Sequence, residues 1–189
     1  MSLAVSGSRV RAVFFDRDGT LNWPALPGDY IRTPGELQLL PGAAAAVRRV
    51  NDSKFLAVLA TNQRWLSEPG ADAEAYASVE TELHRLLEAA GARLDASYTC
   101  PHATGSCKCR KPLPGLLLRA ADELGISLAD SYFIGDSLTD AEAGAAAGVT
   151  TILISAERNS TVSRHATYVV ETIGEAVGVV FGGELRTGT

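Results

Sequence analysis

The stretch VFFDRDGTLN, residues Val13 to Asn22, decides the fold, because its apolar run ends abruptly at two aspartates. A short apolar run bounded by polar and turn residues is typical of a buried β-strand. Asp16 and Asp18 are separated by one residue, so in an extended segment both carboxylates project to the same side. Two like charges held that close need a cation nearby. The stretch therefore predicts a buried strand whose carboxyl end carries an acidic, cation-binding site.

The rest of the chain alternates short apolar runs with alanine- and leucine-rich helical segments. Parallel strands need crossover connections, usually helices, and these helices then cover both faces of the sheet. We therefore predict an α/β fold in which a Rossmann-like parallel sheet is sandwiched between helices. The expected strands cover residues 11–16, 55–61, 95–100, 131–136, 149–155 and 166–170; the expected helices cover 42–52, 71–91, 114–125, 139–147 and a segment from about 172.

Length and composition fit one globular unit. A chain of 189 residues can bury one full core, so we expect a single domain over residues 1–189. The formal net charge of −5 argues against a general nucleic-acid or anionic-membrane surface. No apolar run approaches the roughly 20 residues of a membrane span, and the N-terminus lacks a secretory-signal pattern. We expect a cytoplasmic protein.

Polar side chains close three of the expected strands, namely Asp16, Thr61 with Asn62, and Asp136. In open parallel sheets ligands bind at the carboxyl ends of the strands, so these groups converge on one crevice if the strands are neighbours. A lone aspartate at a strand end is more often a turn or cap residue. Here, however, Asp136 joins the first pair and Asp140 lies nearby. Carboxylates with few other donors suit Mg²⁺ together with a substrate phosphate.

A phosphate at this site needs positive charge as well. Arg110 and Lys111 follow a cysteine cluster and are the candidates. If both face the phosphate, their charges and that of Mg²⁺ balance those of Asp16, Asp136 and a phosphate dianion to about zero. The predicted site is therefore neutral with the metal ion and the substrate both present, and removing either one alone leaves two unbalanced charges.

These motifs, in this order and spacing, resemble the haloacid dehalogenase superfamily of phosphatases. The resemblance lies in DRDGT from Asp16, TN at Thr61 and Asn62, RKP around Lys111, and GDSLTD around Asp136. More narrowly, DGTLN, LLPGAAAAVRRVN, TNQ, CPH, CKCRKPLPG and GDSLTDAEAG are similar to the group of heptose 1,7-bisphosphate phosphatases and histidinol-phosphate phosphatases, over most of residues 11–155. The resemblance implies a haloacid dehalogenase-like fold, here without a large cap domain.

The resemblance also implies a role for each aspartate. Asp16 is expected to attack phosphorus and form an aspartyl-phosphate. Asp18 is expected to protonate the leaving alkoxide and then to deprotonate the hydrolytic water. Its presence favours phosphate-ester hydrolysis over dehalogenation. The Mg²⁺ ligands are expected to be the carboxylates of Asp16 and Asp136 and the backbone carbonyl of Asp18.

Other residues of the motifs are expected to bind the substrate. The Thr61 hydroxyl and the Asn62 backbone N–H would hold the phosphoryl oxygens, and Lys111 would bridge the phosphate and the nucleophile. Arg110 and Gln63 are expected to contact the substrate beyond the phosphoryl group that is transferred.

All three cysteines lie in the stretch CPHATGSCKCRKP, with one histidine among them. Cys100, His102, Cys107 and Cys109 form a Cys3His set that suits tetrahedral zinc, and four protein ligands make such a site structural. The alternative is a chance cluster of surface thiols. We predict a zinc-stabilised loop over residues 100–109 that holds the following arginine and lysine in place.

Two segments depart from the pattern of the group. Residues 64–70 replace a small glycine-containing loop, and Trp65 within them is either a packing residue or part of a substrate cover. NWPALPGDY, residues 22–30, also differs. Because there is no room for a large cap, we expect the zinc loop to screen the crevice. His84 and His165 have no partner pattern and are expected at the surface.

The resemblance implies a Mg²⁺-dependent phosphatase that acts on a phosphorylated sugar, first of all the 7-phosphate of D-glycero-D-manno-heptose 1,7-bisphosphate. Histidinol phosphate is the alternative substrate, and the adjacent Arg110 and Lys111 lean toward the bisphosphate. A rival from another class is a non-catalytic binding module that docks through its zinc loop. We expect a monomer, because the sequence has no long exposed apolar helix.

Overall fold

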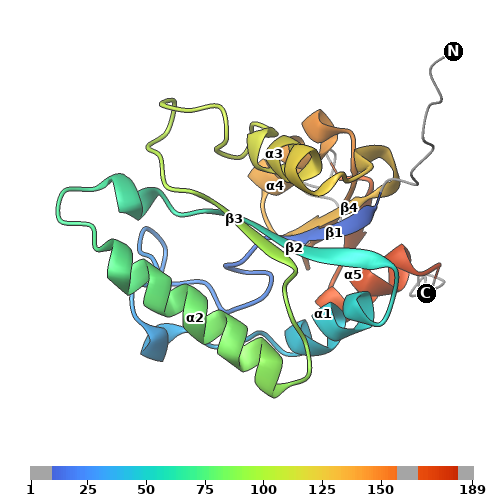
Figure 1. Cartoon of the computed structure of the whole chain (residues 1–189), viewed down its shortest axis with the longest axis horizontal. Helices are drawn as coiled ribbons and strands as arrows, with labels where there is room; N and C mark the ends of the chain where they lie inside the picture. The colour runs from blue at the N-terminus through green and yellow to red at the C-terminus, as the bar shows by residue number, and fades with distance from the viewer. Residues whose placement is uncertain (1–9, 157–165, 183–189) are drawn as a thin grey trace, which may run out of the picture.

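The computed structural model describes residues 10–156 and 166–182 and confirms the predicted α/β architecture (Figure 1). Within these residues a six-stranded sheet has the order β3-β2-β1-β4-β5-β6, and neighbouring strands are parallel throughout. His165 lies outside the described residues. The strands are β1 Arg11–Phe15, β2 Phe55–Asn62, β3 Ala96–Cys100, β4 Tyr132–Gly135, β5 Thr150–Ile154 and β6 Tyr168–Val170.

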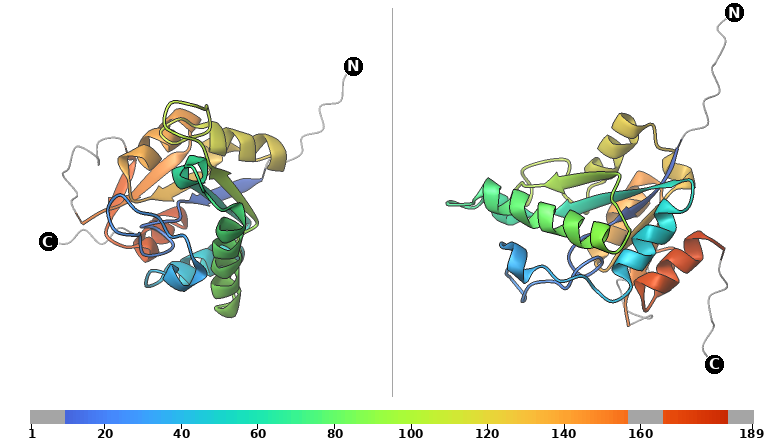
Figure 2. Two further views of the ribbon diagram at one scale, coloured as in Figure 1. Left: turned by 90° about the vertical axis from the view of Figure 1, so that its left-hand side faces the viewer. Right: turned by 60° about the horizontal axis from the view of Figure 1, so that its bottom comes forward.

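Helices cover both faces of the sheet, as Figures 1 and 2 show. On one face lie α3 (Gly115–Leu124) and α4 (Leu138–Ala147), and on the other lie α1 (Ala43–Asn51), α2 (Ala73–Ala89) and α5 (Ile173–Val180). The short 3₁₀ helices are η1 (Pro34–Glu36), η2 (Arg64–Ser67) and η3 (Leu128–Asp130). The predicted strands and helices are all present, with ends that differ by about two residues at most.

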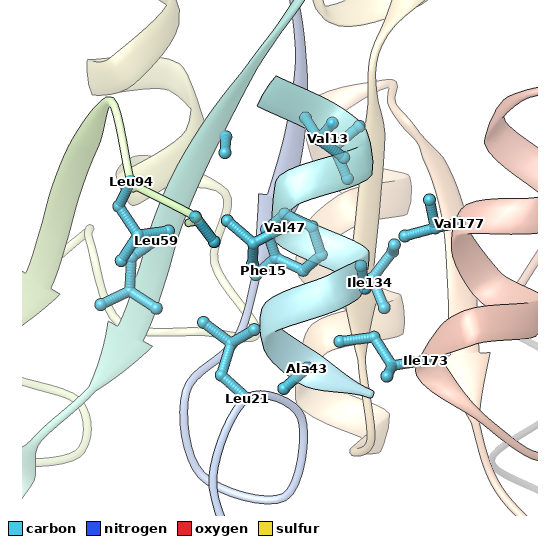
Figure 3. Packing of buried hydrophobic residues seen from close by; sticks show 14 of the residues in the cluster. Val13, Phe15, Leu21, Ala43, Val47, Leu59, Leu94, Ile134, Ile173 and Val177 are labelled. Carbon is cyan, nitrogen blue, oxygen red and sulfur yellow. The ribbon is translucent and has the colours of Figure 1, made fainter. Parts of the chain in front are cut away.

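Strand β1 lies in the middle of the sheet and is buried on both faces. Val13 and Phe15 pack into the core beneath α1 and α5, whereas Phe14 packs into the second core beneath α3 and α4. Figure 3 shows Phe15 beside Val47 of α1, with Ile134 of β4 close by. Side chains that alternate between two cores explain why the sequence of this strand is a continuous apolar run.

The chain order places the carboxyl ends of three strands side by side. From β1 the chain continues to β2 and β3 on one side, and later to β4, β5 and β6 on the other. Strand β1 is therefore the point at which the strand order reverses, with β2 and β4 as its neighbours. Ligands of doubly wound sheets bind at this point. None of the helices in the described ranges has the length and apolarity to span a bilayer.

Candidate active site

A pocket of about 260 Å³ opens at the carboxyl ends of β1 and β2. Asp16 directly follows β1, and Thr61 and Asn62 close β2. Lys111 reaches the same pocket from the segment between β3 and α3, and Thr139 reaches it from the first turn of α4. The structure thus brings together side chains that are more than a hundred residues apart in sequence, as we predicted from the polar residues at the strand ends.

Three carboxyl groups gather beside this pocket. Asp16, Asp136 and Asp140 each place an oxygen within 4.8 Å of the other two. Burial and then the charge of Asp140 raise the pKa of Asp16 to about 7, and the nearby Lys111 only partly opposes this shift. Desolvation and Asp140 likewise raise the pKa of Asp136 to about 6. Carboxyl groups with raised pKa values gain most from an added cation, so the cluster fits a divalent metal ion.

Lys111 provides the positive charge of the cluster. Its Nζ lies 2.7 Å from Oδ1 of Asp16 and 2.6 Å from Oδ1 of Asp140, and it donates to the Ala60 carbonyl at 3.0 Å. The residue is only 3% exposed. Desolvation disfavours the charged ammonium, but Asp140 and Asp16 outweigh it and raise the pKa of Lys111. The lysine therefore stays charged and fixes one oxygen of Asp16.

Asp140 serves as the anchor of this lysine. While its Oδ1 faces Lys111, its Oδ2 accepts hydrogen bonds from the backbone N–H and the hydroxyl of Ser137, at 3.1 and 2.5 Å. Ser137 and Asp140 together form the capping box that begins α4. No role of Asp140 was predicted from the sequence, although a serine followed three residues later by an acidic residue signals this box. Both carboxylate oxygens have partners, so Asp140 is better suited to holding Lys111 than to binding metal.

Backbone contacts fix the other parts of the cluster. The Asn62 side chain donates to the Lys111 carbonyl at 3.0 Å and accepts from the Lys111 N–H at 3.1 Å. Gly19 has a φ of 86°, and a Cβ at this position would collide with the Asp136 carboxylate. Glycine is therefore required by both backbone conformation and space. Together these contacts set the distance between the ends of β1, β2 and β4.

Asp18 is held by four hydrogen bonds. Arg17 donates from Nε to Oδ1 at 3.3 Å and from Nη2 to Oδ2 at 3.1 Å. Asn22 donates to Oδ1 at 2.9 Å, and Gln63 donates to Oδ2 at 2.8 Å. Asp18 also lines the pocket, so its carboxylate is oriented from behind while it faces the space where a substrate would lie.

Gln63, which the sequence analysis assigned to the substrate, is fully buried instead. Its amide nitrogen donates to Asp18 and to the Thr61 hydroxyl, at 2.8 and 3.0 Å, and its amide oxygen accepts from the Trp65 indole at 3.0 Å. Gln63 therefore positions two pocket residues. Trp65 is 2% exposed and stacks edge-on against Tyr76, so of its two proposed roles the structure supports packing.

Residues 24–31 form much of the pocket wall. Among the described residues that line the pocket, none belongs to the loop 100–109, so the expectation that this loop screens the crevice is wrong. The wall is tied to η2, because Nε of Arg64 donates to the Tyr30 hydroxyl at 3.3 Å. Just beyond the two segments, Nη2 of Arg32 lies 3.3 Å from Oε2 of Glu68. The sequence could not reveal this role, because residues 22–30 show no helix or strand periodicity.

Arg110 lies beside the pocket lining and is not part of it. Its side chain is half-buried, and its backbone N–H donates to Cys107 Sγ at 3.4 Å. The residue thus connects the cysteine cluster to Lys111. His84, the other histidine expected at the surface, is half-buried on α2.

The predicted zinc ligands converge in the loop after β3. Sulfur-to-sulfur distances are 3.3 to 3.6 Å, and Nδ1 of His102 lies 3.2 Å from Cys109 Sγ and 3.7 Å from Cys100 Sγ. A tetrahedral zinc with bonds of about 2.3 Å to sulfur needs ligand separations of about 3.8 Å. Burial and the two neighbouring thiols raise the pKa of Cys109 to about 12. The donor set and its packing therefore fit a closed tetrahedral metal site.

Comparisons with known proteins agree with the fold and the site. The HAD-hydrolase-like family pattern matches residues 108–176. The D-glycero-β-D-manno-heptose-1,7-bisphosphate 7-phosphatase of Yersinia pestis is 36% identical over 150 residues, which is 75% of this chain and 78% of the relative. The D-glycero-D-manno-heptose-1,7-bisphosphate 7-phosphatase of Thermosynechococcus vestitus is 39% identical over 158 residues, 76% of this chain and 78% of the relative.

A solved structure extends the similarity to three dimensions. The D,D-heptose 1,7-bisphosphate phosphatase of B. bronchiseptica, complexed with magnesium and phosphate, matches with a TM-score of 0.80 and 29% identity. The match covers 92% of this chain and 99% of that one. The chain therefore belongs to the HAD-like hydrolases, in the family of the heptose-bisphosphate phosphatases, and is a phosphoric monoester hydrolase.

Proposed function

We propose that this phosphatase removes the 7-phosphate of D-glycero-D-manno-heptose 1,7-bisphosphate, with Asp16 as the nucleophile. The observation that carries the mechanism is the position of Asp16, which lines the pocket while Lys111 holds one of its carboxylate oxygens. The names of the similar enzymes support the choice of sugar. The substrate would lie with its phosphate toward the ends of β1 and β2 and its sugar toward residues 24–31.

Two steps account for the reaction. A carboxylate oxygen of Asp16 attacks phosphorus, the bond from phosphorus to the sugar oxygen breaks, and the leaving oxygen takes a proton from Asp18. Asp18 then removes a proton from water, which attacks the aspartyl-phosphate and frees inorganic phosphate and Asp16. Lys111, the Thr61 hydroxyl and the Asn62 backbone N–H would bind the phosphoryl oxygens. All five residues line the pocket.

The magnesium ligands we propose are the carboxylates of Asp16 and Asp136 and the backbone carbonyl of Asp18. The donor set is made of hard oxygens, and formal charges support it: four aspartates around the site exceed Lys111 and the buried Arg17 by two negative charges. Bound there, Mg²⁺ would neutralise charge on the phosphoryl oxygens.

We also propose that Cys100, His102, Cys107 and Cys109 hold a structural zinc ion. Four protein ligands leave no position for a substrate or a reactive water. The task of the site would be to order a loop that offers little apolar surface, and so to fix Arg110 next to the pocket. The hydrogen bond from the Arg110 N–H to Cys107 Sγ supports this connection.

Histidinol phosphate remains the second candidate substrate because of one observation. Asp29 lines the pocket, whereas the cation that lines it, Lys111, is engaged by Asp16 and Asp140. An anionic residue in the wall favours a cationic leaving group over a second phosphate. Arg32 offsets this effect in part, since its Nε lies 3.6 Å from the Asp29 carboxylate.

Parallel assays of phosphate release on the two substrates would test the proposal. We expect the larger kcat/KM for heptose 1,7-bisphosphate, and we expect no turnover of either ester by Asp16→Asn. Asp29→Asn tests the specificity. It is expected to raise kcat/KM for heptose 1,7-bisphosphate and to lower kcat/KM for histidinol phosphate. A larger kcat/KM for histidinol phosphate would reverse the assignment, and equal rates for wild type and Asp16→Asn would favour the rival binding module.

We further propose that residues 1–189 form one domain that acts as a monomer in the cytoplasm. One sheet shared by the helices of both faces supports a single domain. The apolar residues Val79, Leu83 and Leu87 of the long helix α2 are buried in the core and so are not available to a second copy. Light scattering after size-exclusion chromatography tests the monomer.

A further inference from the structure

Arg17 is a fully buried arginine directly behind the pocket. Its guanidinium contacts both carboxylate oxygens of Asp18 on one side, and its Nη1 lies 3.5 Å from Oε1 of Glu80 on the other. The ring of Tyr76 lies beside it, with the guanidinium carbon 5.9 Å from the ring centroid. The exposed fraction of Arg17 is 0%. Because an unpaired charge is costly to bury, a guanidinium at this depth requires both of its acidic partners.

The three side chains that donate to Asp18 differ in how many of its carboxylate oxygens they contact. Asn22 and Gln63 each bind a single oxygen, so either bond alone leaves the carboxylate able to turn. Arg17 binds Oδ1 through Nε and Oδ2 through Nη2 at once, and its planar fork also fixes the plane of the carboxylate. Of these three side chains, Arg17 alone contacts both carboxylate oxygens, so it restrains the plane of Asp18 more than either amide does by itself.

Glu80 connects the pair of Arg17 and Asp18 to helix α2. It lies on α2, more than sixty residues from Arg17 in sequence, and its side chain is 16% exposed. Without Glu80, a buried guanidinium would have only Asp18 as an anionic partner and could turn toward solvent or toward the acidic cluster. Glu80 thus holds the guanidinium in the orientation that Asp18 needs.

We propose that Arg17 is a positioning residue that aims the Asp18 carboxylate at the leaving-group oxygen, and that Glu80 holds Arg17 in turn. The inference rests on the proposed roles of Asp16 and Asp18. It concerns one step only: the transfer of a proton to the leaving oxygen as the bond to phosphorus breaks. Phosphoryl binding by Lys111, Thr61 and Asn62 does not depend on it.

This role predicts a dependence on the leaving group. An alkoxide is a poor leaving group and needs the proton, whereas 4-nitrophenolate leaves readily without one. A misaimed Asp18 therefore slows the release of a sugar oxygen more than the release of nitrophenolate. A general loss of structure or of phosphate binding would slow both alike. The ratio of kcat/KM for the alkyl ester to kcat/KM for the aryl ester separates the two explanations.

The experiment compares wild type, Arg17→Lys and Glu80→Gln on heptose 1,7-bisphosphate and on 4-nitrophenyl phosphate. If wild type does not hydrolyse the bisphosphate, that result counts against the proposed substrate, and the fastest alkyl phosphate of a panel takes its place. Glu82→Gln is the matched control, because it breaks the exposed pair with Arg85 on the same helix. The parameter kcat/KM is used because it ends at the first phosphoryl transfer, before the common hydrolysis step.

We expect Arg17→Lys to lower kcat/KM for the sugar ester about 10- to 100-fold, since a displaced catalytic group loses roughly that much. Glu80→Gln is expected to lower it about 3- to 10-fold by the same misalignment. With 4-nitrophenyl phosphate both variants stay within about threefold of wild type, because that leaving group needs no proton. Glu82→Gln keeps wild-type values on both esters.

Equal losses on the two esters, or an undiminished rate on the sugar ester, would overturn the proposal. If Arg17→Lys does not fold, as judged by circular dichroism, Glu80→Gln decides alone. The Glu80 side chain is 16% exposed, and glutamine keeps its shape while removing its charge. An unchanged ratio of the two kcat/KM values in Glu80→Gln then refutes the role of the pair.

Discussion

Asp140 lies 2.6 Å from Lys111, at least as close to the buried ammonium as the proposed nucleophile is. Asp140 is 2% exposed and Lys111 is 3% exposed, so water screens their attraction little. The lysine is thus held by a residue that takes no direct part in the proposed reaction. Its position over Asp16 depends on α4, whose first turn contains Asp140.

Asp140→Asn is expected to destabilise the protein by about 2 to 4 kcal/mol, because it leaves a buried ammonium with one anionic partner instead of two. Activity on any phosphate ester should fall as well, since Lys111 becomes less restrained. Urea unfolding and a phosphate-release assay measure the two effects. Asp130→Asn, at an exposed 3₁₀ helix, is the control. A variant as stable as that control would show that the pair contributes nothing net.

Metal-free protein is expected to lose stability as the pH rises from about 4 to about 7. The pKa values of Asp16, about 7, and Asp136, about 6, lie above the ordinary aspartate value of 3.8, so the folded state binds more protons than the unfolded chain in this range. The free energy of unfolding then decreases with pH. The loss begins above the unfolded-state pKa and is complete once the pH exceeds the folded-state values.

Added Mg²⁺ should cancel this loss, because it stabilises the ionised carboxylates. The increase in Tm on adding MgCl2 is therefore expected to be larger at pH 7.5 than at pH 5. Thermal unfolding without a chelator tests this and leaves the cysteine cluster undisturbed. Asp136→Asn should flatten the pH dependence; the same slope in that variant would contradict the assignment.

Gly19→Ala is expected to weaken Mg²⁺ binding and to abolish most of the activity. A Cβ at this position would collide with the Asp136 carboxylate, and the φ of 86° adds backbone strain of about 1 kcal/mol. Gly70→Ala is a matched control, with a φ of 80° but nothing within 4 Å of the added Cβ. Calorimetric titration of Mg²⁺ into both variants separates strain from collision. Equal affinities would show that the Asp136 contact is unimportant.

Cys107→Ala is expected to remove the bound zinc and to lower kcat/KM about tenfold, mainly through KM, because the loop that carries Arg110 loses its order. Metal analysis by mass spectrometry and steady-state kinetics measure both. Ser106→Ala, next to it on the exposed part of the loop, should keep its zinc and its activity. An unchanged kcat/KM in the zinc-free variant would contradict a role of the loop in catalysis.

The sequence was sufficient for those parts of the site that follow from regular structure. Asp16, Asp136 and the end of β2 meet because parallel strands with buried apolar runs bring their carboxyl ends to one edge. A glycine also marked the end of one predicted helix, because Gly125 follows α3 with a φ of 67°. These features depend on local patterns that a single sequence displays.

The sequence did not predict the positions of residues that are buried although their type is usually exposed. Arginine and glutamine are usually exposed, so Arg17 and Gln63 gave no sign that they would lie behind Asp18. Their positions depend on Glu80 and Trp65, and the contact with Glu80 is formed only when α2 packs on the sheet. The wall at residues 24–31 could not be predicted because irregular segments have no periodicity to interpret.

The two hydrogen bonds between the Asn62 side chain and the Lys111 backbone should keep Lys111 in place when the cysteine cluster loses its order. The Asn62 amide pairs with both the N–H and the C=O of Lys111, as neighbouring strands of a sheet do. The position of the lysine relative to β2 therefore does not depend on the cysteine cluster. The backbone N–H of Arg110, one residue earlier, donates instead to Cys107 of the cysteine cluster. If the proposed zinc ion is lost, we therefore expect the enzyme still to hydrolyse phosphate esters but to discriminate less between them.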